Sequence, residues 1–499
     1  MQDLLVCGGT VITMDPARRV LTNGAVLIRG NRIVAVGDVA ELRAAYPDAA
    51  ALDASAAAIL PGLIDAHGHA GHCLVRCIAE SVRTAAWNPV MERIYFHSTT
   101  PDFWRAEARL AALERLKFGV TTGVSITGGD PRCDDPIYAG GTAEGYTEVG
   151  TRVIVAVGPT YAPWPRQFTS WTSGAPRAVE VTFEQAIQTV AAALHRWHQS
   201  AGGRVLVYPS PAGLMPSFSA SGRTFDALHP PVAQPIDHAQ AKALLQLAEE
   251  YDTGIHTHAY GGMFKAAFDG DVDCLNPRYS VAHCTGISVE EIRIIADAGL
   301  HVVHGPMTRR NVAERCPVVE LLDAGVNVVF GTDGTAPDRS FDILEKLRFG
   351  MWLQRSHFHD PGLLPAGKAL AMVTVDAAKA LGLSDLGSIE PDKLADLTII
   401  DLRKPHLAPI AMVPQQIAYR ASGQDVDTVI VDGKVRMRHR QVVGINEDDI
   451  LADATAQMWE TVERAGVQEH MALPEDFWGL PGGAGATPRS TRAAAYDRV

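Results

Sequence analysis

Hydrophobic and polar positions change their periodicity along the chain. At the N-terminus, short apolar runs alternate with turn signals such as Gly8-Gly9 and Gly30-Asn31, a pattern that predicts β-strands. The expected strands cover residues 4–7, 11–14, 25–29 and 33–36. No helical periodicity begins before about Ala40, so this stretch predicts a small β unit.

From about residue 60 to residue 383, apolar β-branched runs alternate with amphipathic helical segments. The apolar stripe Ala241, Leu244, Leu245 and Ala248 marks one such helix. Strands buried on both faces and separated by helices indicate parallel βαβ units. The expected strands are residues 59–69, 120–126, 152–161, 204–209, 253–258, 279–284, 301–304 and 326–333. About eight units predict an α/β fold of the (β/α)8 TIM-barrel type; an open doubly wound sheet is the alternative, but no Gly-rich phosphate loop follows an early strand.

Strand signals return after about Gly387. The expected strands are residues 397–402, 416–419, 426–431 and 434–437, and Asp432-Gly433 is a strong hairpin turn. We expect residues 1–58 and 388–445 to form a composite β-sandwich that flanks a hydrolase barrel of residues 59–387. Residues 446–499 predict a helix over 450–465 and then a flexible tail.

Composition and charge narrow the partners and the compartment. The net charge of -13 disfavours nucleic acid and anionic membranes, and no apolar run is long enough to span a bilayer. The seven cysteines are odd in number and scattered, which is typical of reduced thiols, and no secretory signal opens the chain. We therefore expect a cytoplasmic protein that acts on a small molecule.

Histidines and an aspartate stand where several expected strands end. His67 and His69 share one strand face because residues i and i+2 point the same way. His258, His283 and Asp333 end later strands of the expected barrel. Since a barrel brings these strand ends to one mouth, the pattern predicts a divalent metal site there.

The motifs around these residues match a known pattern in combination. They are Pro61-Gly62-Leu63-Ile64-Asp65-Ala66-His67-Gly68-His69, Gly119-Val120-Thr121-Thr122, His256-Thr257-His258, Ala282-His283-Cys284 and Gly331-Thr332-Asp333-Gly334, with residues 387–397 and 425–434 in the flanking β unit. With these motifs the chain resembles the amidohydrolase superfamily, in the branch that holds triazine hydrolases and the S-adenosylhomocysteine and cytosine deaminases.

The resemblance implies a metal centre and roles for its residues. One divalent metal ion per subunit, zinc foremost and iron, cobalt or manganese otherwise, would be bound by His67, His69, His258 and Asp333. Asp333 would also be the general base, and His283 would polarise the substrate. The fourth strand ends without the lysine that binuclear relatives use, which favours one metal. Similar enzymes are commonly dimers or higher, so a homo-oligomer is expected.

The chain departs from this branch at the position of its proton shuttle. The relatives carry a Glu three residues after the ligand on strand five, where this chain has Gly261. Ring deamination needs a protonated ring nitrogen, so the glycine favours hydrolysis of an acyclic or exocyclic bond. A second departure follows strand seven, where Arg309 or Arg310 would meet a substrate oxygen or remain in solvent.

Further substrate contacts are expected around the barrel mouth. His256 is either a substrate contact or a structural filler, and His304 ends strand seven. Trp164 and Trp171 lie in a long Pro-rich loop after strand three and suggest an aromatic or hydrophobic substrate.

The sequence therefore favours a metal-dependent hydrolase of a non-peptide C–N or related C–S bond. Its substrate would be a small amide, urea, carbamate or thiocarbamate. Two alternatives stay open: an aminohydrolase or dechlorinating hydrolase of a heteroaromatic ring, and a catalytically inactive barrel that serves as a scaffold.

Overall fold

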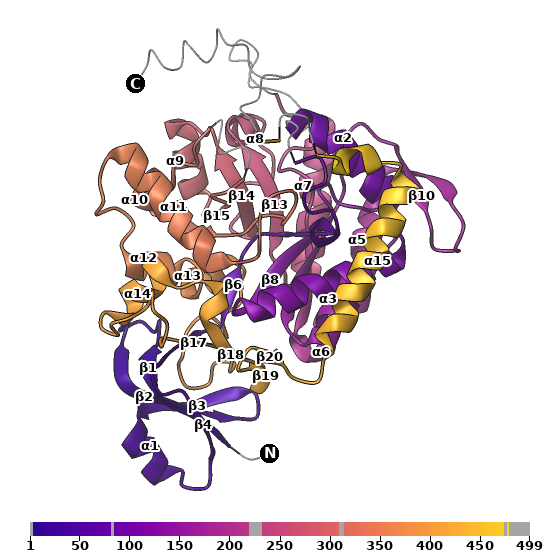
Figure 1. Cartoon of the computed structure of the whole chain (residues 1–499). Coiled ribbons are helices and arrows are strands. Elements are labelled where there is room, and N and C mark those ends of the chain that lie inside the picture. The colour runs from indigo at the N-terminus through magenta and orange to yellow at the C-terminus, as the bar shows by residue number, and fades with distance from the viewer. Residues whose placement is uncertain (1–2, 81–83, 219–231, 309–313, 474–476, 479–499) are drawn as a thin grey trace.

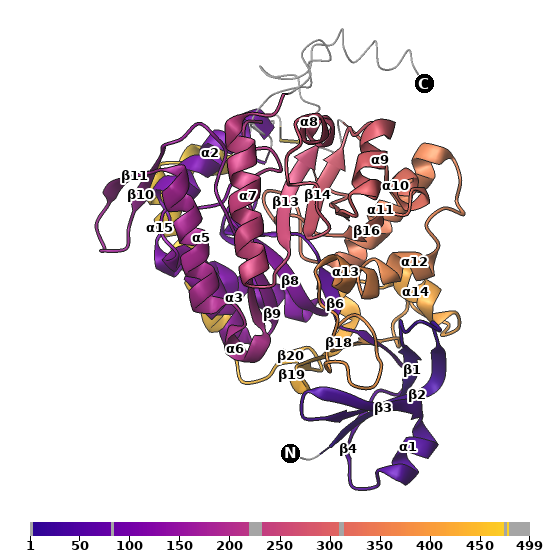
Figure 2. The ribbon, with the colours of Figure 1, turned by 180° about the vertical axis from the view of Figure 1, so that it is seen from behind.

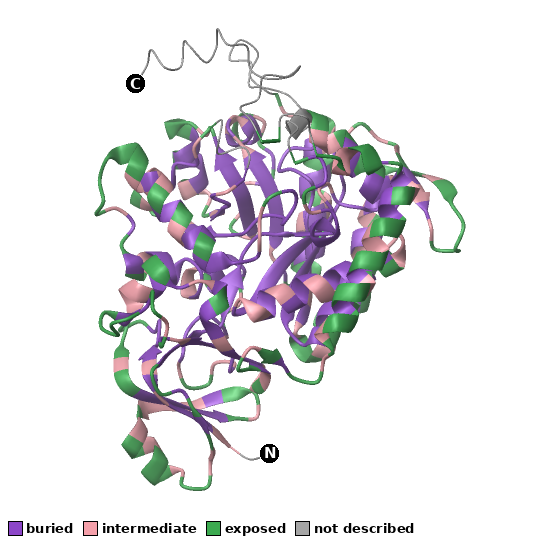
Figure 3. Cartoon of the chain, viewed as in Figure 1, coloured by how far each residue is buried: buried purple, intermediate pink, exposed green. Residues whose placement is uncertain are grey.

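The computed structural model describes residues 3–80, 84–218, 232–308, 314–473 and 477–478. Figure 1 shows a small β unit at the bottom, next to the N-terminus, and a larger α/β unit above it. Figure 2 shows the helices that cover the strands of the larger unit on the opposite side. The strands of the larger unit are almost wholly buried, while the outer helices alternate between buried and exposed positions (Figure 3).

The small unit is built from both ends of the chain. Its strands run in the order β20-β19-β18-β17-β5-β1-β2-β3, with β4 paired to β1. The two ends meet where β17 pairs antiparallel with β5. The strands are β1 (Leu4–Ile12), β2 (Val20–Arg29), β3 (Arg32–Asp38), β4 (Ala50–Asp53), β5 (Ala57–Pro61), β17 (Leu397–Asp401), β18 (Val426–Val431), β19 (Lys434–Arg438) and β20 (Gln441–Val442), and one helix, α1 (Val39–Ala45), follows β3.

The larger unit contains the expected eight-strand pattern as two parallel sheets. One sheet has the order β12-β9-β8-β6, with β7 on β8, and the other has the order β13-β14-β15-β16. Backbone hydrogen bonds join the sheets, from Asp333 to His67 (2.9 Å) and from Leu214 to His258 (2.8 Å). The predicted (β/α)8 class is confirmed. The strands are β6 (Leu63–Asp65), β7 (His69–Ala70), β8 (Val120–Thr127), β9 (Arg152–Val157), β12 (Val205–Pro209), β13 (Ile255–Tyr260), β14 (Tyr279–Thr285), β15 (His301–His304) and β16 (Asn327–Phe330).

Helices cover the outside of these sheets. A capping box between Thr182 and Gln185 starts α5, and another between Ser288 and Glu291 starts α9. The expected C-terminal helix is α15 (Glu447–Ala465), which packs against α3. The others are α2 (Thr84–His97), α3 (Pro101–Lys117), α4 (Ile137–Val149), α5 (Phe183–Trp197), α6 (Ser200–Gly203), α7 (Pro235–Glu250), α8 (Met263–Asp269), α9 (Val289–Asp297), α10 (Val318–Asp323), α11 (Ile343–Phe358), α12 (Ala366–Ala371) and α13 (Val375–Ala380).

Two expected strands were wrong in detail. The run over residues 59–69 divides, because β5 pairs within the small unit while β6 pairs with β8. The chain changes sheets at Gly62, where a Cβ atom would lie 2.1 Å from the Thr121 hydroxyl. The segment 416–419 lies in a helix, α14 (Val413–Arg420), which buries Val413 and Ile417 four residues apart.

Two further features complete the fold. The long loop after β9 contains a hairpin, β10 (Arg166–Ser170) and β11 (Arg177–Val181), which the sequence pattern did not reveal. Among the described residues, no helix combines the length and the apolarity needed to cross a bilayer.

Candidate metal centre

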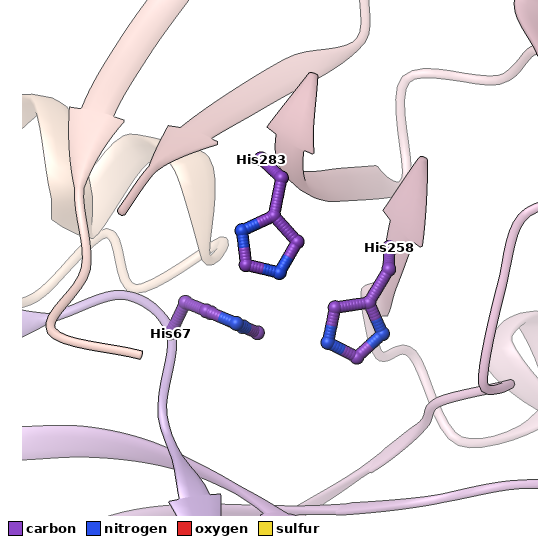
Figure 4. Close-up of side chains that lie close together, drawn as sticks. All are labelled: His67, His258 and His283. Atoms are coloured by element: carbon purple, nitrogen blue, oxygen red, sulfur yellow. The ribbon is translucent and has the colours of Figure 1, made fainter. Parts of the chain in front are cut away.

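The candidate ligands meet at the C-terminal ends of the parallel strands. His67 precedes β7, His69 begins it, His258 lies in β13, His283 lies in β14, and Asp333 follows β16. Figure 4 shows the rings of three of them turned toward one another, His258 and His283 from the neighbouring strands β13 and β14 and His67 from the segment between β6 and β7. The fold thus places donors that are far apart in sequence around one point.

The distances between donor atoms fit a single small cation. Asp333 Oδ1 lies 3.3 Å from His69 Nε2 and 3.6 Å from His67 Nε2, and His258 Nε2 lies 3.4 Å from His69 Nε2. Ligands about 2.1 Å from a tetrahedral zinc would be about 3.4 Å apart. The buried Nε2 of His67 has no hydrogen-bond partner among the described residues, as expected of an atom that faces a metal. The donor set therefore fits a divalent metal.

Backbone carbonyls orient two of the imidazoles. His69 Nδ1 lies 2.6 Å from the Gly128 oxygen, and His258 Nδ1 lies 2.9 Å from the Ala212 oxygen. A carbonyl only accepts, so each Nδ1 carries the proton and donates it, which leaves the Nε2 lone pair for a metal.

His256 extends this arrangement behind His67. Its Nε2 lies 2.8 Å from His67 Nδ1, and its own Nδ1 lies 2.8 Å from the Ser280 hydroxyl. Burial lowers the pKa of both imidazoles well below the usual value, so both are neutral. The structure places His256 as a hydrogen-bond partner of His67 and not on the wall of the cavity.

Asp333 is held as a carboxylate. Burial alone would raise its pKa, but the charge of Arg339 and the adjacent imidazoles of His67 and His69 outweigh burial and hold the pKa well below its usual value. One guanidinium nitrogen of Arg339 lies 3.6 Å from Asp333 Oδ2. Asp333 and His283 both have positive φ angles, 63° and 75°, which are uncommon for non-glycine residues.

A buried ion pair fixes the strand ends that carry His67 and Asp333. Asp65 accepts hydrogen bonds from the Thr332 backbone nitrogen and hydroxyl, both at 2.8 Å, and from Arg115 at 2.7 Å. Both charged side chains are almost fully buried. Since Asp65 precedes His67 by two residues and Thr332 precedes Asp333, the pair links the first and last barrel strands beside the site.

The site opens into one cavity with aromatic walls. Most of the aromatic side chains come from α2 and from the segments after β9 and within β13. The lining includes the donors His69, His258, His283 and Asp333 together with His72, Trp87, Met91, Glu92, Tyr95, Phe96, Asp130, Tyr161, Tyr260, Thr308, Pro337 and Arg339.

Several predicted substrate contacts lie away from this cavity. Trp171 donates to the His97 carbonyl (2.8 Å) and stacks under Arg464, Trp164 packs against Phe183, and His304 lies against Phe330. None of these three side chains, Trp164, Trp171 and His304, lines the cavity. Arg309 lies outside the described residues.

Other cavity residues were missed from the sequence, although two had a signal. Tyr260 follows His258 by two residues on β13 and therefore shares its face, and its ring stacks on His283 with centroids 5.6 Å apart. His72 is the third histidine of His67-x-His69-x-x-His72. The aromatic residues of α2 had no comparable signal.

The structure explains why position 261 is a glycine. A Cβ atom there would lie 2.0 Å from the Gly286 oxygen, and the Gly261 nitrogen donates to the Thr285 oxygen at 2.9 Å. Tyr260, and not residue 261, faces the cavity, because it lies two residues after His258 on β13. No side chain fits at this position without a shift of the backbone.

Comparison with family models matches most of the chain. The model described as "Amidohydrolase family" matches residues 58–436. A second model, "Imidazolonepropionase-like composite domain, bacteria", matches residues 24–49 within the small β unit.

Known proteins resemble the chain over nearly its full length. The 5'-deoxyadenosine deaminase of Methanococcoides burtonii is 31% identical over 93% of this chain and 99% of its own length. The 5-methylthioadenosine/S-adenosylhomocysteine deaminase of Pelotomaculum thermopropionicum is 28% identical over 93% and 100%. Among solved structures, the zinc complex of the atrazine chlorohydrolase from Arthrobacter aurescens TC1 superposes with a TM-score of 0.76 at 26% identity, covering 91% of this chain and 100% of that one.

Proposed function

Because the chain belongs to the amidohydrolase family, we propose that it hydrolyses a small hydrophobic or aromatic amide, urea, carbamate or thiocarbamate. The chain is an enzyme of the class that acts on carbon–nitrogen bonds other than peptide bonds. Zinc is the proposed metal, since the related chlorohydrolase was solved with zinc and the donors here are imidazoles and one carboxylate.

One observation carries the choice of substrate class. The wall beside His283 presents the phenol ring of Tyr260, and Gly261 leaves no room for a carboxylate. A heteroaromatic ring must be protonated as its C–N bond breaks, whereas an acyl or carbamoyl carbon is already electrophilic. The site therefore supports attack on an acyclic carbonyl carbon better than attack on a ring carbon.

The protein residues have separate roles in this reaction. A divalent metal held by these residues would supply a water whose pKa is lowered to about 7. Asp333, ionised beside Arg339, accepts a proton from the attacking water and returns it to the departing nitrogen. His283 faces the same point and polarises the substrate carbonyl, a contribution that is typically worth about 3–4 kcal/mol. The aromatic walls exclude water and hold an apolar group.

The proposal is tested with zinc-loaded enzyme and matched substrates. Acetanilide, phenylurea and phenyl N-methylcarbamate are compared with 5'-deoxyadenosine and a chlorinated triazine, with product release followed by chromatography. We expect at least one acyclic substrate to have a kcat/KM about tenfold above both heterocycles. Faster turnover of either heterocycle would overturn the preference.

A second candidate is hydrolysis at a heteroaromatic ring, and Asp130 is the specific residue that favours it. Burial and, secondarily, Glu92 raise the pKa of Asp130 to about 6, so that this cavity carboxyl can deliver a proton near neutral pH. The nearly full-length similarity to deaminases supports the same reading. If this candidate is correct, Asp130→Asn removes turnover of the ring substrates and spares that of acetanilide.

Compartment and assembly are part of the proposal. We propose a cytoplasmic homo-oligomer. Free cysteines, six of the seven of them buried, support a reducing compartment. Exposed Trp352 on α11 together with Met412 and Tyr419 near α14 supports a contact between copies. Light scattering of the purified protein tests the assembly, and a monomer at micromolar concentration would contradict it.

A further inference from the structure

His72 stands in a tightly held turn directly after the metal-binding strand. It opens a 3-10 turn (His72–Leu74) that is preceded by Gly71, whose φ is 87°. The turn is fixed from α3, where Glu107 accepts a hydrogen bond from the Cys73 nitrogen at 3.3 Å. The imidazole is therefore held in place by the backbone of its own turn.

The ring of His72 is buried without polar partners. Its exposed fraction is 3%, and neither ring nitrogen has a hydrogen-bond partner among the described residues. An unsatisfied buried polar group costs about 1–3 kcal/mol, which leucine or phenylalanine at this position would avoid. Such a group calls for a ligand or a functional reason.

The neighbours of His72 fix the direction of its nitrogens. The ring stacks between His69 (centroids 4.9 Å, 13°) and Tyr95 (5.8 Å, 2°), and Trp87 meets it edge to face at 5.7 Å. Two glycines border the ring edges. A Cβ atom at Gly334 would lie 1.8 Å from Nδ1, and one at Gly129 would lie 3.7 Å from Nε2. His72 and Gly129 both line the cavity, so the Nε2 edge of the ring is the one that borders the cavity, with Nε2 itself covered by its neighbours.

His72 is unlike the candidate metal ligands in its placement. Its nitrogens do not share the point on which the nitrogens of the candidate ligands converge. Neither group of converging donor atoms found among the described residues includes it. A role toward the substrate remains.

We propose that His72 is a specificity-determining residue that hydrogen-bonds through Nε2 to a heteroatom adjacent to the scissile bond, on the aromatic side of the substrate. The rings of Tyr95 and His69 stack on the imidazole of His72 and hold it in place. The substrate ring then lies in the plane of the imidazole, next to Nε2, and Trp87 lies beside the imidazole. This inference rests on the proposed function, and it narrows the substrate to anilide-like compounds with a ring nitrogen or a polar ortho substituent.

The first test measures binding and needs no turnover. 2-Aminopyridine and aniline, the two amines that such anilides release, are titrated into zinc-loaded protein by calorimetry at mildly alkaline pH, where both are neutral. We expect the wild type to bind 2-aminopyridine about fivefold more tightly, the worth of one net hydrogen bond. His72→Phe keeps the ring and should bind both amines equally, and His72→Gln should keep part of the preference.

The controls separate this role from a structural one. Thr142→Val removes another buried, partnerless polar atom, on α4 outside the cavity, and should leave the preference unchanged. Zinc content should be equal in all variants. An unchanged preference in His72→Phe, an absent preference in the wild type, or loss of zinc in His72→Phe would each overturn the inference.

Turnover distinguishes this inference from the proposed function. N-(pyridin-2-yl)acetamide and acetanilide are compared in the same variants, and the ratio of their kcat/KM values should fall about fivefold in His72→Phe. If the wild type hydrolyses neither compound but binds the amines with the expected preference, the proposed function fails while the role of His72 stands.

Discussion

At the scale of single residues, Gly261 shows how backbone packing limits which groups the site can present. The glycine lies where two backbones approach, so that an added methyl group would overlap the Gly286 oxygen. A single substitution could therefore not place a carboxylate there without a shift of the backbone. A proton donor for a ring would have to come from another element, as Asp130 does.

Gly261→Ala is expected to destabilise the protein by about 1–3 kcal/mol, the usual cost of overpacking. The matched control is Gly367→Ala in α12, where no atom lies within 4 Å of the added Cβ and where alanine favours the helix by about 0.5–1 kcal/mol. Denaturant unfolding of both variants measures the difference. Equal stability of the two would show that the backbone at 261 adapts.

The residues that the sequence could reveal are those fixed by strand periodicity. His67, His69, His258 and Asp333 occupy strand ends, and the barrel topology alone brings them together. Tyr260 was readable by the same rule. Trp164 and Trp171 were not, because their loop folds into a hairpin against α2 and α15, and only tertiary packing decides which aromatic residues face the cavity.

At the scale of elements, the Asp65–Arg115 pair holds the first barrel strand against the last. Asp65→Asn leaves Arg115 buried without its counter-charge, and we expect a loss of about 3–5 kcal/mol in the free energy of unfolding. Because Thr332 also loses an ionic acceptor beside Asp333, metal affinity should fall about 10–100-fold. Metal-competition titration and denaturant unfolding measure the two effects.

Asp134→Asn is the control for that variant. Asp134 forms an equally buried pair with Arg132, at 2.8 Å, but this pair does not contact the strand ends that carry the ligands. It should lower stability and leave metal affinity unchanged. A similar loss of metal in both variants would mean that Asp65 acts only through global stability.

Element prediction failed where sequence periodicity is ambiguous. The run over residues 59–69 resembles one apolar strand, yet its halves belong to different sheets. The prediction missed this division because the sequence of a short apolar run does not indicate which strand it pairs with. The segment of α14 is short enough to form either a helix or a strand, and the tertiary contacts that bury Val413 and Ile417 favour the helix.

At the scale of the whole molecule, metal binding and folding are coupled. Removal of the metal with a chelator should abolish turnover and lower the apparent free energy of unfolding by about 3–4 kcal/mol at zinc concentrations of 100–1,000 times the dissociation constant. Differential scanning calorimetry with and without chelator measures this. In Asp333→Ala the chelator should shift the melting temperature far less, and an equal shift would place the stabilising metal elsewhere.

The small β unit is joined to the barrel by a charged cluster at the barrel's lower end. Arg152 on β9 donates to Asp396 (2.8 Å) just before β17 and to Asp432 (2.9 Å) in the turn after β18. The sequence predicted the hairpin turn at Asp432-Gly433. It could not predict that this turn contacts the barrel, because Arg152, its partner, is 280 residues away along the chain.

Asp432 makes this contact dependent on pH. Burial alone would raise its pKa, but Asn31, Arg152 and Arg204 outweigh burial and lower it. A carboxyl whose pKa is lower in the folded state than its unfolded value of about 3.9 stabilises the protein fully above that value, and the stabilisation is lost as the pH falls through the folded pKa. Asp432→Asn should therefore cost about 1–2 kcal/mol at pH 7 and nothing at pH values below the folded pKa.

Urea unfolding of the wild type and of Asp432→Asn between neutral and acidic pH measures how the difference between their stabilities falls with pH. Metal-free protein is used, because the pH dependence of metal binding is then absent. Asp401→Asn is the comparison, because Asp401 also has a lowered pKa but pairs with Arg403, which is 71% exposed. An exposed partner is screened by solvent, so the loss at pH 7 should be smaller and should shrink further with added salt. A gap between wild type and Asp432→Asn that stays constant as the carboxyl protonates would show that Asp432 acts by shape and not by charge, and that the two units are held together by their apolar contacts.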